Sequence, residues 1–297
     1  MKIFLTGSTG FVGKQLLKRL LENKYRVKCL VRKGSEHKLE QYINHIEVVN
    51  GDITNPPCLE NVIEDCGAVI NIVGIIREIP GKGITFEKLH YEGTQNLIRE
   101  AKKQGVNRFI QMSALGAKQE GKTLYQQTKF LAEECIRRSG LEYTIFRPSI
   151  IFGKEDKFVN TFAGMLKIQQ FIPVIGDGKY KLQPVAVENV AAAFVDSIER
   201  RDTFGKLYEV GGPEKIEFND VINIIGKVLC LPPYKIHIPV WIMNTLAEML
   251  DWIPAFPVTK DQITMLLEGN TCDEKPFFEH FKINPIYFKE GISRYLS

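Results

Sequence analysis

The sequence predicts an α/β fold: a doubly wound parallel sheet followed by a smaller, mainly helical C-terminal lobe. Two observations support this prediction. In the first half of the 297 residues, short apolar runs alternate with segments whose apolar side chains recur at helical spacing. Such alternation produces right-handed β-α-β crossovers, which cover both faces of a parallel sheet. The first apolar run also leads directly into a glycine-rich turn, which separates it from the first helix.

Each element of the first half follows from its local pattern. Six short segments are apolar, or alternate between apolar and polar residues, which is typical of strands: residues 3–5, 26–31, 46–49, 68–73, 108–112 and 143–146. Three longer segments have apolar residues at helical spacing and are predicted to be helices: residues 12–21, 86–104 and 125–139.

The second half has a looser rhythm and more prolines. Residues 153–297 are expected to return to the sheet once, near residues 207–210, and otherwise to build the smaller lobe. An amphipathic helix is predicted over residues 239–254, and its apolar stripe indicates packing in the core or as a lid, with partner docking as the alternative. Ligands of such folds bind at the carboxyl ends of the strands, so we expect a cleft between the sheet and the lobe.

Composition and charge exclude several classes of protein. Hydrophobic residues make up 44% and charged residues 25% of the chain, which excludes disorder, collagen and coiled coils. The net charge of +4 is small and scattered, so we expect no nucleic acid partner. Six cysteines without C-x-x-C spacing indicate free thiols and no metal site. With no secretory segment before Gly7 and no membrane span, we expect a cytoplasmic protein, at most peripheral on the inner face of the membrane.

Residues 6–13 read Thr-Gly-Ser-Thr-Gly-Phe-Val-Gly, a G-x-x-G-x-x-G loop at the first strand–helix turn. The first glycine permits the tight turn, the second lets the backbone approach a pyrophosphate, and the third lets the helix pack on the strand. The amides and the dipole of the helix attract phosphates. A glycine turn without a ligand is the alternative. We expect residues 1–152 to be a Rossmann-type dinucleotide-binding domain with these loop contacts: Gly7, Ser8, Thr9, Gly10, Phe11, Val12 and Gly13.

The end of the second strand indicates which dinucleotide is bound. Arg32 and Lys33 occupy the positions where an acidic residue would hydrogen-bond the ribose of NAD. The first acidic residue after the second strand is Glu36. A guanidinium can pair with a 2′-phosphate, whereas a carboxylate would repel it. The sequence therefore predicts NADP(H) in preference to NAD(H), with a solvated basic turn as the alternative. Asp52 is placed to accept the adenine amino group, with Ile53 beside the ring, or is a simple turn residue.

Several motifs resemble the extended and atypical short-chain dehydrogenase/reductases. They are the glycine loop, Asn50–Ile53, Ile70–Ile75, Tyr125-x-x-x-Lys129 and Arg147–Ser149. A narrower resemblance, to the NADPH-binding accessory subunits of respiratory complex I and their bacterial relatives, lies in these stretches: residues 90–97, 112–117, 147–160, 183–185 and 256–262. The resemblance covers nearly the whole chain. It implies a Rossmann fold, a bound nucleotide that Val73 and Gly74 contact, and complex I subunits as partners.

Tyr125 and Lys129 are four residues apart and share one face of a helix. We expect the ammonium to lower the tyrosine pKa from ~10 and to help hold the nicotinamide ribose. Tyr125 would then be a general acid or base. Catalytic relatives place a serine or threonine at the end of the preceding strand, but here Ser113 comes one position early and Ala114 occupies the expected place. Ser113 is thus a catalytic candidate or a strand-end hydroxyl bonded to backbone.

The residues after the sixth predicted strand complete the site. Four of them are expected to line the nicotinamide end, with a strand-end packing turn as the alternative: Arg147, Pro148, Ser149 and Ile150. Two functions then follow from the resemblance. One is an NAD(P)H-binding accessory or assembly component of complex I. The other is an active NAD(P)-dependent oxidoreductase or epimerase that uses Tyr125 and Lys129 on a small carbonyl or sugar-nucleotide substrate.

Overall fold

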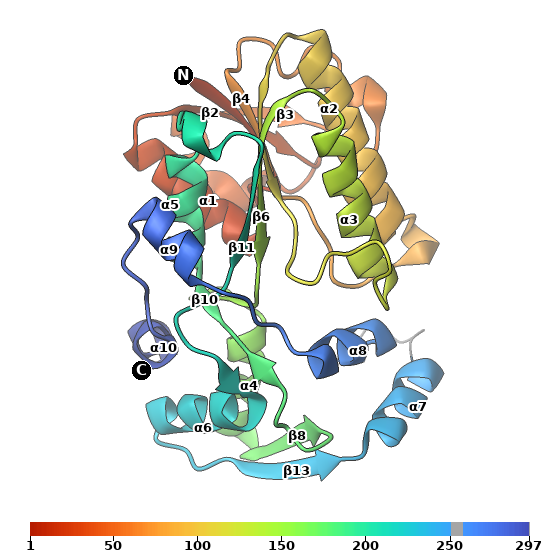
Figure 1. Ribbon diagram of the computed structural model, residues 1–297, viewed down its shortest axis with the longest axis vertical. Coiled ribbons are helices and arrows are strands. Elements are labelled where there is room, and N and C mark those ends of the chain that lie inside the picture. Colours follow the sequence, from red (N-terminus) through yellow and green to blue (C-terminus); the bar gives the residue numbers. More distant parts are fainter. Residues whose placement is uncertain (251–257, 297) are drawn as a thin grey trace. The chain divides into compact units, whose positions relative to one another are not determined.

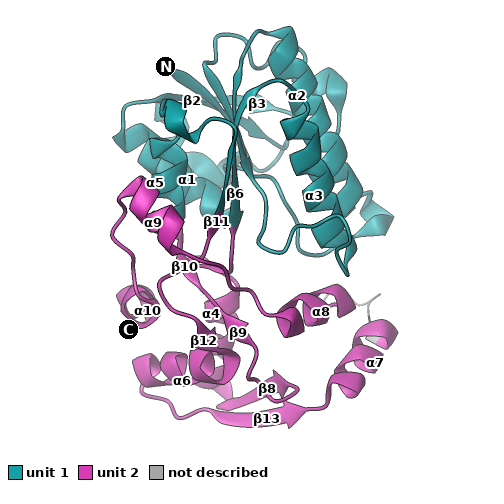
Figure 2. Ribbon diagram, viewed as in Figure 1, with its two compact units in different colours: residues 1–147, 190–208 teal, residues 148–189, 209–297 magenta. Residues whose placement is uncertain are grey.

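The computed structural model describes residues 1–250 and 258–296. The chain divides into two compact units, which Figure 2 shows in separate colours: Met1–Arg147 with Val190–Tyr208, and Pro148–Asn189 with Glu209–Ser297. The first unit is discontinuous, because a second segment from later in the chain completes it, whereas the sequence predicts two continuous regions that meet after residue 152. Among the helices of the described residues, none is both long and apolar enough to cross a bilayer.

The first unit is built on a seven-stranded sheet with the order β11-β6-β5-β4-β1-β2-β3. Its strands are β1 Lys2–Thr6, β2 Arg26–Val31, β3 Ile46–Asn50, β4 Ala68–Asn71, β5 Arg108–Met112, β6 Glu142–Pro148 and β11 Lys206–Val210. β1 pairs in parallel with both β2 and β4, so the strand order reverses at β1. This is the doubly wound topology that the sequence predicts, and β11 is the expected late return to the sheet.

Helices cover both faces of this sheet. Figure 1 shows α2 and α3 on one side and α1 and α5 on the other. Their bounds are α1 Phe11–Glu22, α2 Gly93–Lys103, α3 Leu124–Arg137 and α5 Val187–Asp196. The predicted helix over residues 86–104 is interrupted, because its first part, Glu87–Glu92, is a π-helix. There the backbone N–H of Gly93 donates to the carbonyl of Lys88, five residues earlier, instead of four.

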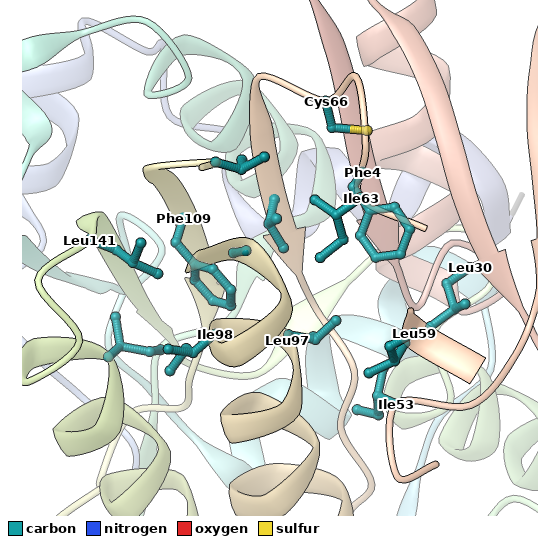
Figure 3. Close-up of a cluster of buried hydrophobic side chains, with 14 of the residues drawn as sticks. Phe4, Leu30, Ile53, Leu59, Ile63, Cys66, Leu97, Ile98, Phe109 and Leu141 are labelled. Carbon is teal, nitrogen blue, oxygen red and sulfur yellow. The ribbon is translucent and has the colours of Figure 1, made fainter. Parts of the chain in front are cut away.

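An apolar core fills the space between the sheet and α2 and α3. Phe4, Val69 and Phe109 stand opposite one another on β1, β4 and β5 and are fully buried. Figure 3 shows Phe4 and Phe109 in this cluster together with Leu97 and Ile98 of α2. Each fully buried side chain of this size contributes about 1.5–3 kcal/mol, so the core fixes the strands whose ends form the site described below.

The second unit combines short strand pairs with helices. Its pairs are β7 Ile151–Phe152 with β10 Val185–Ala186, β9 Lys181–Leu182 with β12 Ile216–Glu217, and β8 Phe171–Ile175 with β13 Tyr234–Ile238. Its helices are α4 Phe158–Ile168, α6 Phe218–Leu229, α7 Val240–Leu250, α8 Lys260–Glu268, α9 Lys275–Phe281 and α10 Phe288–Leu296. α7 forms the start of the helix predicted over residues 239–254. The rest of that helix, and residues 256–257 of the motif 256–262, lie outside the described residues.

Arg108, at the start of β5, attaches the late segment Val190–Tyr208 to the sheet. Its buried guanidinium donates hydrogen bonds of 2.6–3.3 Å to five acceptors: the carbonyls of Glu142, Ser197 and Ile198 and the hydroxyls of Thr144 and Thr203. It also lies 4.4 Å from the centroid of the Phe204 ring. Burial lowers the pKa of Arg108 to about 10, so the side chain is still charged at neutral pH.

Replacing Arg108 with Met is expected to destabilise the protein by about 3 kcal/mol, because several buried acceptors lose their donor. Urea unfolding followed by circular dichroism measures this as a fall in the midpoint. Arg138→Met is the matched control, since the Arg138 side chain is 81% exposed and its loss should change stability by less than about 0.5 kcal/mol. Equal midpoints for the two variants would contradict the role given to Arg108.

Candidate nucleotide-binding site

The glycine loop has no room for side chains at two of its positions. Gly7 follows β1 with a φ of +80°, and a Cβ there would lie 3.0–3.2 Å from atoms of Ile72 and Val73. A Cβ on Gly13 would lie 2.1 Å from the carbonyl oxygen of Gly7, closer than any real contact. The N–H of Gly10 donates to the same carbonyl at 3.1 Å. The first and third glycines therefore have the roles that the sequence predicts.

The N-terminus of α1 is open to an anion. Gly10 is its N-cap residue and provides no side-chain hydrogen bond, and the first turn contains no acid. The amides of Phe11, Val12 and Gly13 thus begin the helix without a carboxylate competing for them. Thr9 is partly exposed on this loop, whereas Ser8 is fully buried. A tight glycine turn ahead of an uncapped helix without an acid in its first turn fits the diphosphate of a dinucleotide.

The neighbouring strand ends carry the residues expected at the adenosine half. β2 lies beside β1, and the side chains of Arg32 and Lys33, just after β2, are exposed. After β3, Asp52 Oδ1 accepts from the N–H and the hydroxyl of Thr54, at 2.9 and 2.8 Å. Asp52 is therefore a turn residue in this structure, and its contact with adenine stays a prediction. Ile53 is buried in the core against Gly93, so its side chain anchors the segment after β3 to the core.

A buried polar network joins the carboxyl ends of three central strands. Thr6 Oγ1 donates to Asn71 Oδ1 at 2.7 Å, and Asn71 Nδ2 donates to Gln111 Oε1 at 3.0 Å. Asn71 Oδ1 also accepts from the N–H of Val73, at 3.2 Å. These side chains are at most 2% exposed. The network thereby fixes the loop after β4, residues 72–75, which we call the β4 loop. This loop includes the predicted nucleotide contacts Val73 and Gly74. Polar residues that end apolar strands are the sequence signal that would have found it.

Tyr125 and Lys129 share one face of α3, as predicted. The helix begins at a capping box, in which Thr123 and Gln126 satisfy each other's backbone N–H groups. Lys129 is 3% exposed, and its Nζ donates to the carbonyl of Met112 at 3.4 Å. Nζ lies 6.0 Å from the centroid of the Tyr125 ring. A Cβ on Gly74 would come within 2.9 Å of Nζ, so the β4 loop and α3 meet at a glycine.

Burial controls the protonation of this pair. It lowers the pKa of Lys129 to about 8, although the Glu133 carboxylate acts in the opposite direction. It raises the pKa of Tyr125 to about 12. The expected lowering of the tyrosine pKa is therefore wrong for this structure, because desolvation outweighs an ammonium that faces the ring. At neutral pH Tyr125 keeps its proton and can donate a hydrogen bond.

The guanidinium of Arg147 orients α3, and the expected place of Arg147 at the nicotinamide end stays a prediction. Its Nε and Nη2 each donate to the Glu133 carboxylate at 2.7 Å, and Arg137 adds a third hydrogen bond at 2.8 Å. The Glu133 side chain is fully buried, and it lies one turn beyond Lys129 on α3. The paired charges thus hold the helix that carries Tyr125 and Lys129 against β6.

The remaining predicted residues have different surroundings. Ser113 is 3% exposed, its N–H donates to the carbonyl of Phe146 at 2.7 Å, and its hydroxyl has no hydrogen-bond partner among the described residues. A hydroxyl bonded to backbone is thus not what the structure shows. Pro148, Ser149 and Ile150 belong to the second unit, where the Ser149 hydroxyl donates to the carbonyl of Asn270 at 3.0 Å. Their contact with the nicotinamide end stays a prediction.

His90 is a residue of this region that the sequence did not single out. It lies in the π-helix, is 1% exposed, and hydrogen-bonds to both Ile75 and Thr128. Its ring stacks on Phe86 and meets the ring of Tyr125 edge-on, with centroids 5.4 and 5.3 Å apart. The stretch of residues 90–97 carried the family resemblance, but only the packing of the π-helix against α3 shows that the imidazole reaches Tyr125.

Comparisons with known proteins support nucleotide binding. Residues 7–200 match the NAD(P)H-binding family model. Subunit 9 of the NADH dehydrogenase [ubiquinone] 1 alpha subcomplex, from Arabidopsis thaliana mitochondria, is 31% identical over 275 residues, which are 89% of this chain and 67% of that one. The mitochondrial 40 kDa subunit of NADH-ubiquinone oxidoreductase from Neurospora crassa is 24% identical over 285 residues, which are 94% of this chain and 74% of that one.

The solved structures show the same fold. The dTDP-glucose 4,6-dehydratase DesIV of Streptomyces venezuelae, solved with NAD, aligns over all of this chain and 96% of its own, with a TM-score of 0.81 and 18% identity. At that identity the likeness concerns the fold alone. The match to the family model and the relation to the Arabidopsis subunit go further. This chain belongs to the NAD(P)H-binding family of Rossmann proteins, within the group that includes subunit 9 of the 1 alpha subcomplex of mitochondrial NADH dehydrogenase.

Proposed function

We propose that this chain holds NADPH as an accessory or assembly component of a respiratory complex I. The observation that carries the proposal is the relation to the Arabidopsis subunit, which extends over 89% of this chain. Ala114 supports a structural use of the nucleotide, because this buried alanine stands where the sequence analysis expects a catalytic hydroxyl. Attachment to the complex would be peripheral, through protein partners at the cytoplasmic face of the membrane.

In this proposal, different residues of the site bind different parts of the nucleotide. The loop of Gly7 to Gly13 would receive the diphosphate, and Arg32 and Lys33 the 2′-phosphate. Lys129 and Tyr125 would donate hydrogen bonds to the nicotinamide ribose. NADPH supplies a hydride when an enzyme uses it, but here its binding energy is sufficient: a ligand at 1,000 times its Kd adds about 4 kcal/mol to stability.

One observation favours a second function, an active NAD(P)-dependent oxidoreductase or epimerase with a small carbonyl or sugar-nucleotide substrate. The hydroxyl of Ser113 is buried and has no partner among the described residues, one position after the carbonyl that Lys129 contacts. A buried hydroxyl without a partner costs about 1–3 kcal/mol, and a substrate oxygen would satisfy it. Tyr125 would then protonate that oxygen.

Membership of the complex and catalysis are separated by two variants. Tyr125→Phe should leave NADPH affinity within about threefold and should leave the chain comigrating with a complex I core subunit on native gels. Gly13→Ala should abolish both, because its Cβ cannot fit beside the Gly7 carbonyl. The wild-type chain migrating only as a small soluble species would refute the accessory role. A phenotype of Tyr125→Phe cells that matches loss of the protein, with NADPH binding retained, would point to catalysis instead.

The preference for NADPH is expected to depend on Arg32. Arg32→Ala should weaken NADPH binding at least tenfold, about 1.4 kcal/mol, and leave NADH binding unchanged, because only NADPH carries the 2′-phosphate. Fluorescence titration of both nucleotides measures the effect. Lys38→Ala is the control, since Lys38 is an exposed basic residue of the same segment. Equal losses for NADPH and NADH would show that Arg32 does not recognise the 2′-phosphate.

The pKa of Lys129 predicts two opposite pH effects. The pKa of Lys129 in the folded chain, about 8, lies below the ordinary lysine value of 10.5. The unfolded chain therefore binds more protons between these values, and the stability of the protein without nucleotide should rise with pH across that window. NADPH affinity should fall as pH rises above 8, because the ammonium loses its charge. Urea unfolding and calorimetric titration from pH 7 to 10 measure both, and Lys129→Met should flatten both profiles. Profiles unchanged in Lys129→Met would assign the titration to another group.

A further inference from the structure

The hydrogen bonds of His90 define a single neutral tautomer. The N–H of Ile75 donates to Nε2 at 3.2 Å, so Nε2 carries no proton. The proton is therefore on Nδ1, which donates to Thr128 Oγ1 at 3.0 Å. The Thr128 hydroxyl in turn donates a hydrogen bond to the carbonyl of Leu124, at 2.8 Å. Burial, reinforced by the charge of Lys129, lowers the pKa of His90 to about 2, so the ring stays neutral.

The π-helix is what brings this imidazole to α3. Thr94 Oγ1, on the first turn of α2, donates to the His90 carbonyl at 2.6 Å. Thr94 in turn accepts from Asn71 Nδ2 at 3.2 Å, which ties the π-helix to the polar network at the strand ends. A π-turn is less favourable than an α-turn and is frequent at functional sites. Here hydrogen bonds from His90 to Ile75, Thr128 and Thr94 hold its side chain and its carbonyl in place.

The imidazole and the Lys129 ammonium converge on Gly74. A Cβ at Gly74 would lie 2.9 Å from Lys129 Nζ and 3.7 Å from His90 Nε2. The His90 ring also meets the Tyr125 ring edge-on, and the Phe86 ring stacks on the His90 ring. His90 therefore contacts three parts of the pair's surroundings: Ile75 after β4, Thr128 on α3, and the aromatic ring of Tyr125.

We propose that His90 is a positioning residue, which ties the β4 loop to α3 and thereby holds Tyr125 and Lys129 in place for the nicotinamide ribose. This rests on the proposed function, since it assumes that the pair contacts the nicotinamide half. A rigid ring with one acceptor and one donor nitrogen joins the two elements in one geometry. Removing it should harm recognition of the nicotinamide half and spare the adenosine half, which the glycine loop and Arg32 bind.

The test compares NADPH with 2′-phospho-ADP, which has the adenine half and the diphosphate but neither the second ribose nor the nicotinamide. His90→Phe should weaken NADPH binding about tenfold and change 2′-phospho-ADP binding less than twofold. His90→Gln should restore NADPH affinity to within about threefold of wild type, because an amide supplies one acceptor and one donor. Thr128→Val, which removes one partner at similar volume, should weaken NADPH binding alone, and it serves if His90→Phe does not fold.

Each other outcome overturns the inference in a distinguishable way. If both probes weaken equally in the His90 and Thr128 variants, His90 supports the fold in general and positions nothing. If wild type prefers NADPH to the fragment and the variants keep that preference, the inference fails while the proposed function stands. If wild-type protein binds NADPH no better than 2′-phospho-ADP, the pair does not hold the nicotinamide half, and this part of the proposed function fails with it.

Discussion

The constraint on which the site depends is the contact between the start of α1 and the end of β1. Gly13 packs so closely on the carbonyl of Gly7 that a single Cβ would collide with it. That closeness aims the first amides of α1 at the edge of the sheet, where β1 separates β2 from β4. The turn at Gly7 also packs closely against Ile72 and Val73, so it constrains the geometry of the β4 loop. A Rossmann sheet gives this position a dipole and a shape, and both suit a phosphate.

Near this contact, the apolar core ends and a layer of buried polar side chains begins. The network through Thr6, Asn71 and Gln111 lies at the carboxyl ends of the strands, directly above the row of Phe4, Val69 and Phe109. Apolar packing specifies distance between elements poorly, whereas directional hydrogen bonds between satisfied partners specify it well. The core therefore supplies stability, and the polar layer supplies the register of the loops that contact a ligand. His90 extends that layer from the strands to α3.

Local spacing carried most of what the sequence could predict. The glycine loop, the alternation of elements and the shared face of Tyr125 and Lys129 depend on residues near one another in the chain, and the structure has all three. What the sequence missed depends on tertiary packing. The contacts of His90, which lies in the π-turn, are with the loop after β4 and with α3, and both are far from it in the sequence. The pKa of Tyr125 follows from burial, which spacing does not encode. The bond of Arg147 to Glu133 joins residues of different elements, so only the fold shows it.

The discontinuity of the first unit bears on how the chain is made. Arg108 is buried among acceptors that come about 90 residues later, at Ser197, Ile198 and Thr203. On a ribosome, which releases the chain from its N-terminus, the sheet can assemble through β6 while this guanidinium still faces water. The unit closes only after Tyr208 has emerged, and by then residues 148–189 of the second unit are already outside. A nascent chain stalled before β11 would therefore expose the edge of β6 to pairing with other chains.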